Sequence, residues 1–479
     1  MYLSSYIGKG KLILFSVILT GTGFQACKKA VEVPVPKNSL VGSAVFSDNK
    51  TATAVMTGLY NTMHSAANIS DGTWSIGKFM GTAADELHNY FIGVAATQFY
   101  KNNLSSNPGT YFWDNFFKFI YIANSTIEGV EQSETLKAEV KQQLLGEARF
   151  MRAFINFYAV NLYGDIPLPT STDYKINNKL TRSSQQEAYK LILDDLQEAK
   201  KLLTAEYKSA SNLTTTEKIR PNKAAATAML ARVYLYLKDW RNAELQATEL
   251  IGNSSYGLIP LNQVFLKNSK EAIWQLASAN PVYTNTMDGF FYTLKTTPGI
   301  SNHNSMTDWL YNSFETGDAR KTGWVGSFTA GATTYRYASK YKNSERSSAV
   351  TEYFMVLRIA EQFLIRAEAR AQQDNPAALD DLNEIRFRAG LDDYNGATDK
   401  PSVLNAIQRE RRVELFTEWG HRWFDLKRTG SLDALMSGPT GITALKGGEW
   451  NKNDTILPLP ITEIAVNPNL RQNKGYDPQ

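Results

Sequence analysis

The stretch PNKAAATAMLARVYLYLKDWRNAELQATELIG (221–252) predicts two packed helices joined by a short turn. Small and aromatic residues recur in it at the spacing of a tetratricopeptide repeat, whose unit is a helix–turn–helix hairpin. The residues that carry the pattern are Ala231, Tyr234, Ala243, Ala247 and Leu250. Alanines let the two helices approach closely, and the aromatic side chain fills the groove between neighbouring units. These positions therefore predict packing and no chemistry.

A second unit of this kind is expected at about 356–390, where Ala367, Ala378, Leu382 and Ile385 fit the pattern with a turn one residue shorter. Further helices are predicted from a start near Ser47-Asp48 and by helical apolar spacing in four other segments. Those segments are 111–130, 134–163, 184–203 and 402–420. The expected fold class is all-α, mostly helical, built on a tetratricopeptide-repeat scaffold.

Two segments lack this periodicity, at about 65–109 and 253–350, and are rich in Gly, Asn, Ser, Thr and aromatic residues. We expect both to be loop-rich, with short strands such as Glu271–Leu276 and Thr333–Ala338 in the second. An insertion of nearly 100 residues is too long for a simple connection, and long loops on a rigid scaffold commonly carry binding residues. The prediction is a loop-rich insertion on one face of the scaffold.

The N-terminus has the layout of a secretory signal peptide, residues 1–26. Lys9 and Lys11 precede the apolar run LILFSVILT (12–20), which is too short to span a bilayer. Cys27 follows directly and is the only cysteine, so a lipid-modified Cys27 of a bacterial lipoprotein is expected. The alternative is a plain secretion signal followed by an incidental thiol. Residues 27–45 are interpreted as a lipidated tether and 46–479 as a single helical domain.

Several segments together resemble the SusD-like (RagB/SusD) family of nutrient-binding outer-membrane lipoproteins. They are GLYNTM (58–63), GEARFMRAFINFYAVNLYGDIPL (146–168), AMLARVYLYLKDWRNAELQA (228–247), YGLIPLNQVF (256–265) with EAIWQL (271–276), LNEIRFRAGL (382–391), RERRVELFTEWGHRWFDLKRTG (409–430) and LPLPITEIAVNPNLRQNKGY (457–476). They occur in the family's order and cover almost the whole chain after the signal peptide. The resemblance implies a lipid-anchored protein of the cell outer membrane, facing outward. Such proteins bind glycan and deliver it to a SusC-like TonB-dependent transporter.

Composition and motifs argue against other functions. The formal net charge is only +4, and no basic stripe is interleaved with aromatic residues, so nucleic acid is not an expected partner. Four dispersed histidines and one terminal cysteine make a metal site unexpected, and no phosphate-binding or nucleophile motif occurs, so we expect no cofactor and no enzyme activity. The charged run from Arg409 to Asp425 is interpreted as structural Arg–carboxylate pairing.

A glycan site needs flat rings that stack on sugar faces and polar groups that bind hydroxyls. The loop candidates are Trp74, Tyr90, Phe99, Tyr100, Trp309, Tyr311, Trp324 and Tyr335, with polar neighbours Asp85, Asn89, Asn302, Asp308 and Arg336. From these we predict ligand binding by Trp74, Tyr90, Trp309, Tyr311, Trp324 and Arg336. For any single ring, ordinary packing is the competing interpretation.

The sequence leaves three other functions open. A peptide-binding member of the same family is poorly separated from a glycan binder, although abundant loop Trp and Tyr favour sugar. A tetratricopeptide scaffold that only bridges proteins is opposed by the signal peptide and the aromatic insertion. A hydrolase would need paired carboxylates, and the adjacent pairs Asp85-Glu86 and Asp392-Asp393 are of a kind that any long chain contains.

Overall fold

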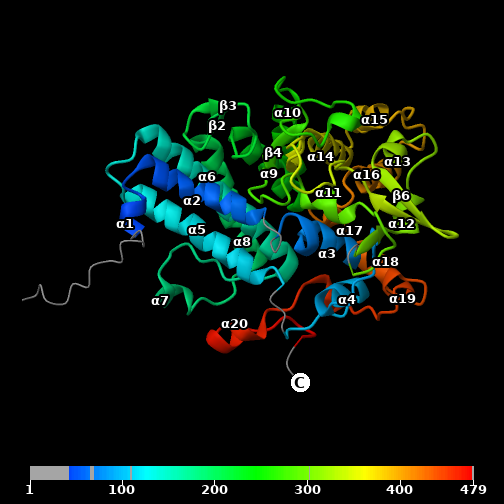
Figure 1. Ribbon diagram of the computed structural model, residues 1–479, viewed down its shortest axis with the longest axis horizontal. Coiled ribbons are helices and arrows are strands. Elements are labelled where there is room, and N and C mark those ends of the chain that lie inside the picture. Colours follow the sequence, from blue (N-terminus) through cyan, green and yellow to red (C-terminus); the bar gives the residue numbers. More distant parts are fainter. Residues whose placement is uncertain (1–41, 65–68, 108–110, 301–302, 477–479) are drawn as a thin grey trace, which may run out of the picture. The chain divides into compact units, whose positions relative to one another are not determined.

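The computed structural model describes residues 42–64, 69–107, 111–300 and 303–476 (Figure 1). The expected signal peptide, Cys27 and the tether as far as residue 41 lie outside the described residues. The end of the expected tether, Gly42–Val45, is a one-turn helix, α1, and not an extended segment. Among the described helices none is both long and apolar enough to cross a bilayer.

The scaffold consists of long helices that pack in series (Figure 1). They are α2 (Asn49–Met63), α5 (Trp113–Gln132), α6 (Ala138–Tyr163), α8 (Gln185–Leu202), α9 (Lys223–Tyr236), α10 (Trp240–Ile251), α14 (Ile359–Gln372), α15 (Ala378–Arg388) and α16 (Lys400–Glu414). Helix α6 packs against α5 and α8, α8 against α9, and α10 against α14. The hairpins α9–α10 and α14–α15 are the two expected repeat units, so the prediction of a helical tetratricopeptide scaffold is confirmed.

Local sequence explains why these helices form where they do. Ser184 begins α8 with a capping box: its hydroxyl accepts from the Glu187 amide at 3.2 Å, and its own amide donates to the Glu187 carboxylate at 2.8 Å. In α9 every residue from Ala224 to Leu235 is buried, and its alanines allow helices to approach it from several sides.

Strands are few and occur as two-stranded antiparallel sheets. The pairs are β1 (Leu87–Asn89) with β5 (Asn304–Met306), β2 (Tyr207–Lys208) with β3 (Thr214–Thr215), β4 (Ala272–Leu276) with β8 (Phe354–Arg358), and β6 (Val325–Ala330) with β7 (Thr333–Ala338). The predicted strands at 271–276 and 333–338 correspond to β4 and β7. The remaining helical segments are short and lie mainly in the insertions and the C-terminal part. They are η1 (Gly72–Trp74), α3 (Ile76–Ala83), α4 (Val94–Lys101), α7 (Tyr174–Asn177), η2 (Leu261–Gln263), α11 (Met287–Tyr292), α12 (Asp308–Tyr311), α13 (Ala319–Gly323), α17 (His421–Arg428), α18 (Leu432–Met436), α19 (Ile442–Leu445), η3 (Lys452–Thr455) and α20 (Ile461–Val466).

The segment 65–109 contains more regular structure than its loop-rich composition indicated. This segment contains the helices α3 and α4 and the strand β1. All residues of α3 are buried, including Lys78 and Thr82, so the helix has no polar face. Without an alternation of polar and apolar faces, no amphipathic period marks such a helix in the sequence.

The helix expected at 402–420 ends earlier, at Glu414. Thr417, Trp419 and Gly420 all have positive φ, which interrupts helical geometry. The Lys340 ammonium donates to the Glu414 and Phe416 carbonyls at 2.8 Å each. These bonds satisfy main-chain acceptors at the end of the helix. This turn directs the Glu418 side chain toward β8.

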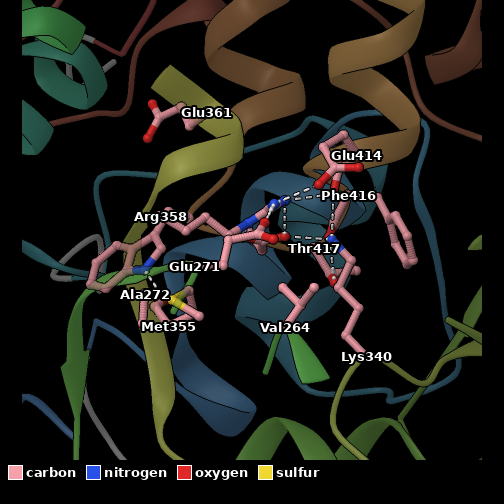
Figure 2. Close-up of polar contacts among 12 residues, drawn as sticks. Val264, Glu271, Ala272, Lys340, Met355, Arg358, Glu361, Glu414, Phe416 and Thr417 are labelled. Carbon is pink, nitrogen blue, oxygen red and sulfur yellow. Dashed lines mark hydrogen bonds and ion pairs between the residues drawn. The ribbon is translucent and has the colours of Figure 1, made fainter. Parts of the chain in front are cut away.

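A buried cluster of charged side chains joins β8, the end of α16 and the insertion (Figure 2). Arg358 contacts the carboxylates of Glu271, Glu414 and Glu418 at 2.9, 2.5 and 2.8 Å. Lys340 contacts Glu418 at 2.5 Å. Burial alone would raise the pKa of Glu414, but neighbouring arginines, including Arg358, hold it well below its usual value. The interpretation of the 409–425 run as structural pairing is therefore confirmed for these carboxylates.

Candidate binding site at an aromatic patch

The two segments expected to carry the site meet in the β1–β5 ribbon. Leu87 pairs with Met306 and Asn89 with Asn304, which joins parts of the chain more than 200 residues apart. The β6–β7 hairpin packs beside β5. Parts of both loop-rich segments therefore lie side by side at this ribbon.

An aromatic patch covers one side of this ribbon. It consists of His88, Tyr90, Tyr100, Trp309 and Tyr335, all of them partly exposed. The His88 ring lies 6.3, 6.5 and 6.0 Å from the rings of Tyr90, Tyr100 and Trp309, and Tyr90 meets Tyr335 edge-on at 6.2 Å. The patch thus offers ring faces together with hydroxyl and imidazole groups at one surface.

The patch has a buried polar support. Asp85 accepts from Arg412 at 2.6 Å and from Arg422 at 2.8 Å, and Arg412 also donates to the Trp309 carbonyl at 3.1 Å. Burial would raise the pKa of Asp85, but the two guanidinium groups outweigh it and the pKa is lowered. Asp85, a polar neighbour among the sequence candidates, is therefore a buried carboxylate that positions the patch. The position of Arg412 and Arg422 beneath the patch has no signal in the sequence, where the charged run indicates only structural pairing.

Tyr311 and Arg336 lie at the edge of the patch and are already in contact. The Arg336 guanidinium carbon is 3.8 Å from the centroid of the Tyr311 ring, and the Lys321 ammonium is 4.3 Å from it. Arg336 also contacts the exposed carboxylate of Asp308 at 2.9 Å. The Tyr311 ring therefore already binds two cations. The Arg336 guanidinium places a positive charge at the edge of the aromatic patch.

Trp74 lies apart from the patch, in a cavity of about 370 Å³. Its side chain is 42% exposed, and the other walls include Phe91, Tyr111 and His303. Phe91 stacks on His303 at 4.3 Å, whereas the preceding Tyr90 contacts Tyr335 on the patch. Tyr90 and Phe91 follow β1 directly and contact different neighbours, which separates the two aromatic surfaces. The ligand role of Trp74 stays a prediction.

The prediction that Trp324 contacts ligand is wrong. Trp324 is 1% exposed, its indole nitrogen donates to the Leu261 carbonyl at 3.1 Å, and its ring packs on Phe265 at 5.4 Å. Trp324 directly precedes β6, and its Gly- and Thr-rich sequence neighbours gave no indication of this burial. Phe99 is also buried, and Asn302 lies outside the described residues. In the part of the chain that the structure describes, no group of three or more His, Cys, Asp or Glu residues could hold a metal ion.

Two family models match the chain. The model described as "SusD family" matches residues 270–476, and the model described as "Starch-binding associating with outer membrane" matches residues 44–235. A "SusD-like protein P38" of Formosa agariphila is 26% identical, over 97% of this chain and 98% of its own length. The "Starch-binding protein SusD" of Bacteroides thetaiotaomicron is 27% identical, over 33% of this chain and 28% of its own.

Solved structures show the same fold. A "Laminarin binding SusD-like protein" aligns with a TM-score of 0.73 at 21% identity, covering 89% of this chain and 99% of the other. The "Surface glycan-binding protein A" of Bacteroides fluxus aligns with a TM-score of 0.74 at 20% identity, covering 90% and 100%. At 20–21% identity this likeness shows a shared fold alone.

Proposed function

The chain belongs to the SusD family, and from that premise we propose that it binds an oligo- or polysaccharide at the aromatic patch and delivers it to a SusC-like TonB-dependent transporter. The observation that carries the proposal is the convergence of partly exposed rings from two distant segments on one surface. Relatives of the same fold are described as laminarin-binding and glycan-binding. Flat rings beside hydroxyl, imidazole and guanidinium groups suit a sugar, which has apolar faces and a polar rim.

The proposal is of binding without catalysis. A glycosidase needs two carboxyl groups placed on either side of the scissile bond. The carboxylate beneath the patch, Asp85, is buried and accepts from two arginines. Asp308 is the exposed carboxylate beside the patch, and Arg336 is bound to it. Both carboxylates are therefore engaged by arginine side chains.

A glycan array with a parallel hydrolysis assay tests this function. Wild type should retain one glycan class and release no reducing sugar from it, and Trp309→Ala should lose that retention. Retention of peptides and of no glycan would favour the peptide-binding alternative. Release of sugar from the bound glycan would contradict the proposal of binding without catalysis.

We also propose that Cys27 carries the lipid that holds the protein at the outer membrane, facing outward. The support is the signal layout of residues 1–26 and the outer-membrane association named in the description of the family model. Cys27→Ser should move the protein from the membrane fraction to the soluble fraction, because the acyl chains would be absent. Fractionation and protease treatment of whole cells measure attachment and orientation. Unchanged membrane attachment of Cys27→Ser would contradict the anchor.

A further inference from the structure

A cavity of about 620 Å³ lies among the β2–β3 hairpin, the start of α9 and the end of α10. Its walls include Tyr207, Thr214, Lys223, Leu250 and Asn268. None of its lining residues belongs to the aromatic patch or to the Trp74 cavity. Its volume is within the range of small-molecule sites, about 300–1,000 Å³.

Three lysines line this cavity without an acidic partner: Lys218, Lys223 and Lys270. Within the described ranges, none of the three forms an ion pair with Asp or Glu. Of the two acids that line the same cavity, Glu249 is bound to Lys200 at 2.6 Å. The other, Glu206, is exposed. The cavity therefore has an excess of positive charge, which an anion would offset.

The Lys218 ammonium is fixed at the buried end of the cavity. It is 9% exposed and donates to the Ser269 and Ala272 carbonyls at 2.9 and 2.8 Å. A lysine ammonium has three donors, so two carbonyl bonds leave one further hydrogen. Burial, together with the nearby charge of Lys270, lowers the pKa of Lys218 to about 8. A bound anion would stabilise the charged form of this group.

The start of α9 adds to the same positive potential. Lys223 is the first residue of the helix, and the first turn contains no acidic residue. The amide groups at a helix N-terminus carry partial positive charge, which favours anions and disfavours a lysine at this position. Lys223 therefore adds its charge to the partial positive charge of this helix end, where the Asn222 side chain caps the Ala225 amide.

Hydroxyl and amide groups line the remainder of the cavity. The Tyr207 and Tyr256 hydroxyls in the wall lie 2.7 Å apart, and the amide of Asn222, a buried residue outside the wall, donates to Tyr256 at 3.2 Å. Thr214 and Asn253 are also in the wall. Such groups can exchange hydrogen bonds with the hydroxyls of a sugar.

We propose that this cavity is a second binding site that takes an acidic sugar, a hexuronic acid unit. Its carboxylate binds among Lys218, Lys223 and Lys270, and its hydroxyls bind the polar wall. The site is independent of the aromatic patch, because the two share no residue. An acidic saccharide could therefore bind to the repeat scaffold while the patch is empty.

The test is calorimetry of the full chain with sodium glucuronate, glucose and sodium sulfate at matched ionic strength. Glucuronate should bind at least about ten-fold more tightly than glucose or sulfate. Glucose lacks the carboxylate, and sulfate lacks the sugar hydroxyls. Lys223→Gln/Lys270→Gln should weaken glucuronate binding about ten-fold or more, and Lys267→Gln, an exposed lysine outside the cavity, should not. Melting curves check that each variant is folded.

Two comparisons separate this site from the patch and from simple anion binding. Trp309→Ala should bind glucuronate like wild type. Glucuronate binding is therefore expected even if the aromatic patch does not bind glycan. Sulfate binding as tight as glucuronate binding would overturn the sugar site. Absence of glucuronate binding, or a double variant that binds like wild type, would also overturn it.

Discussion

At the scale of single residues, Asp85 and Glu86 are neighbours with opposite environments. Asp85 is held ionised by Arg412 and Arg422. Glu86 is fully buried, and burial together with the charge of Asp85 raises its pKa to about 7, although its carboxylate accepts from the Thr417 amide at 3.3 Å. One oxygen of Glu86 has no hydrogen-bond partner among the described residues. Beneath the patch, Asp85 is thus paired with two arginines, whereas Glu86 keeps one carboxylate oxygen without a partner among the described residues.

Glu86→Gln should remove the contribution by which Glu86 lowers stability as pH rises. Above about pH 4.5 the unfolded chain ionises Glu86, whereas the folded chain keeps its proton up to about pH 7. Glu86 therefore lowers the free energy of unfolding as pH rises through that window, by up to about 3 kcal/mol. Urea unfolding of both proteins at pH 5 and pH 8 measures the effect. The exposed Glu384→Gln is the control, and equal pH dependence of wild type and Glu86→Gln would refute the assignment.

At the scale of elements, α3 is held against the turn that follows α16. A Cβ atom added at Gly77 would meet the Thr417 carbonyl oxygen at 2.5 Å and the Trp419 amide nitrogen at 3.3 Å. Only glycine allows this approach of helix to main chain. The contact sets the position of α3, whose end leads into Asp85 and β1, and so the position of the patch.

Gly77→Ala should lower the free energy of unfolding by about 1–3 kcal/mol, because main-chain atoms must move apart. Gly58→Ala is the matched control in α2, where an added Cβ meets nothing within 4 Å. That substitution should raise stability by about 0.5–1 kcal/mol, as alanine does in an exposed helix interior. Thermal melting of both variants measures the difference. A Gly77→Ala protein as stable as Gly58→Ala would show that α3 is not constrained in this way.

At the scale of the whole molecule, sequence periodicity predicted the repeat scaffold well and gave no indication of how the segments of the candidate site meet. The alanine spacing of 221–252 identified the α9–α10 hairpin, because close helix packing has a local signature. The pairing of Leu87 with Met306 has no such signature, since it depends on how distant segments meet. Composition singled out Tyr90 and Trp309, which the structure brings into one aromatic patch, but could not distinguish them from the buried Trp324. Burial of a lone ring in an aperiodic segment is decided by tertiary packing.

The most direct test of the central claim is calorimetric titration with the glycan that the array selects. Tyr90→Ala/Trp309→Ala should weaken binding by about ten-fold or more, taking stacking at about 1–3 kcal/mol per ring, the scale known for bases on aromatic side chains. Tyr174→Ala removes a ring that is 66% exposed and lies outside the patch, and it should bind like wild type. Each protein must show a wild-type melting curve. If the folded double variant binds the glycan as tightly as wild type does, the aromatic patch is not the binding site.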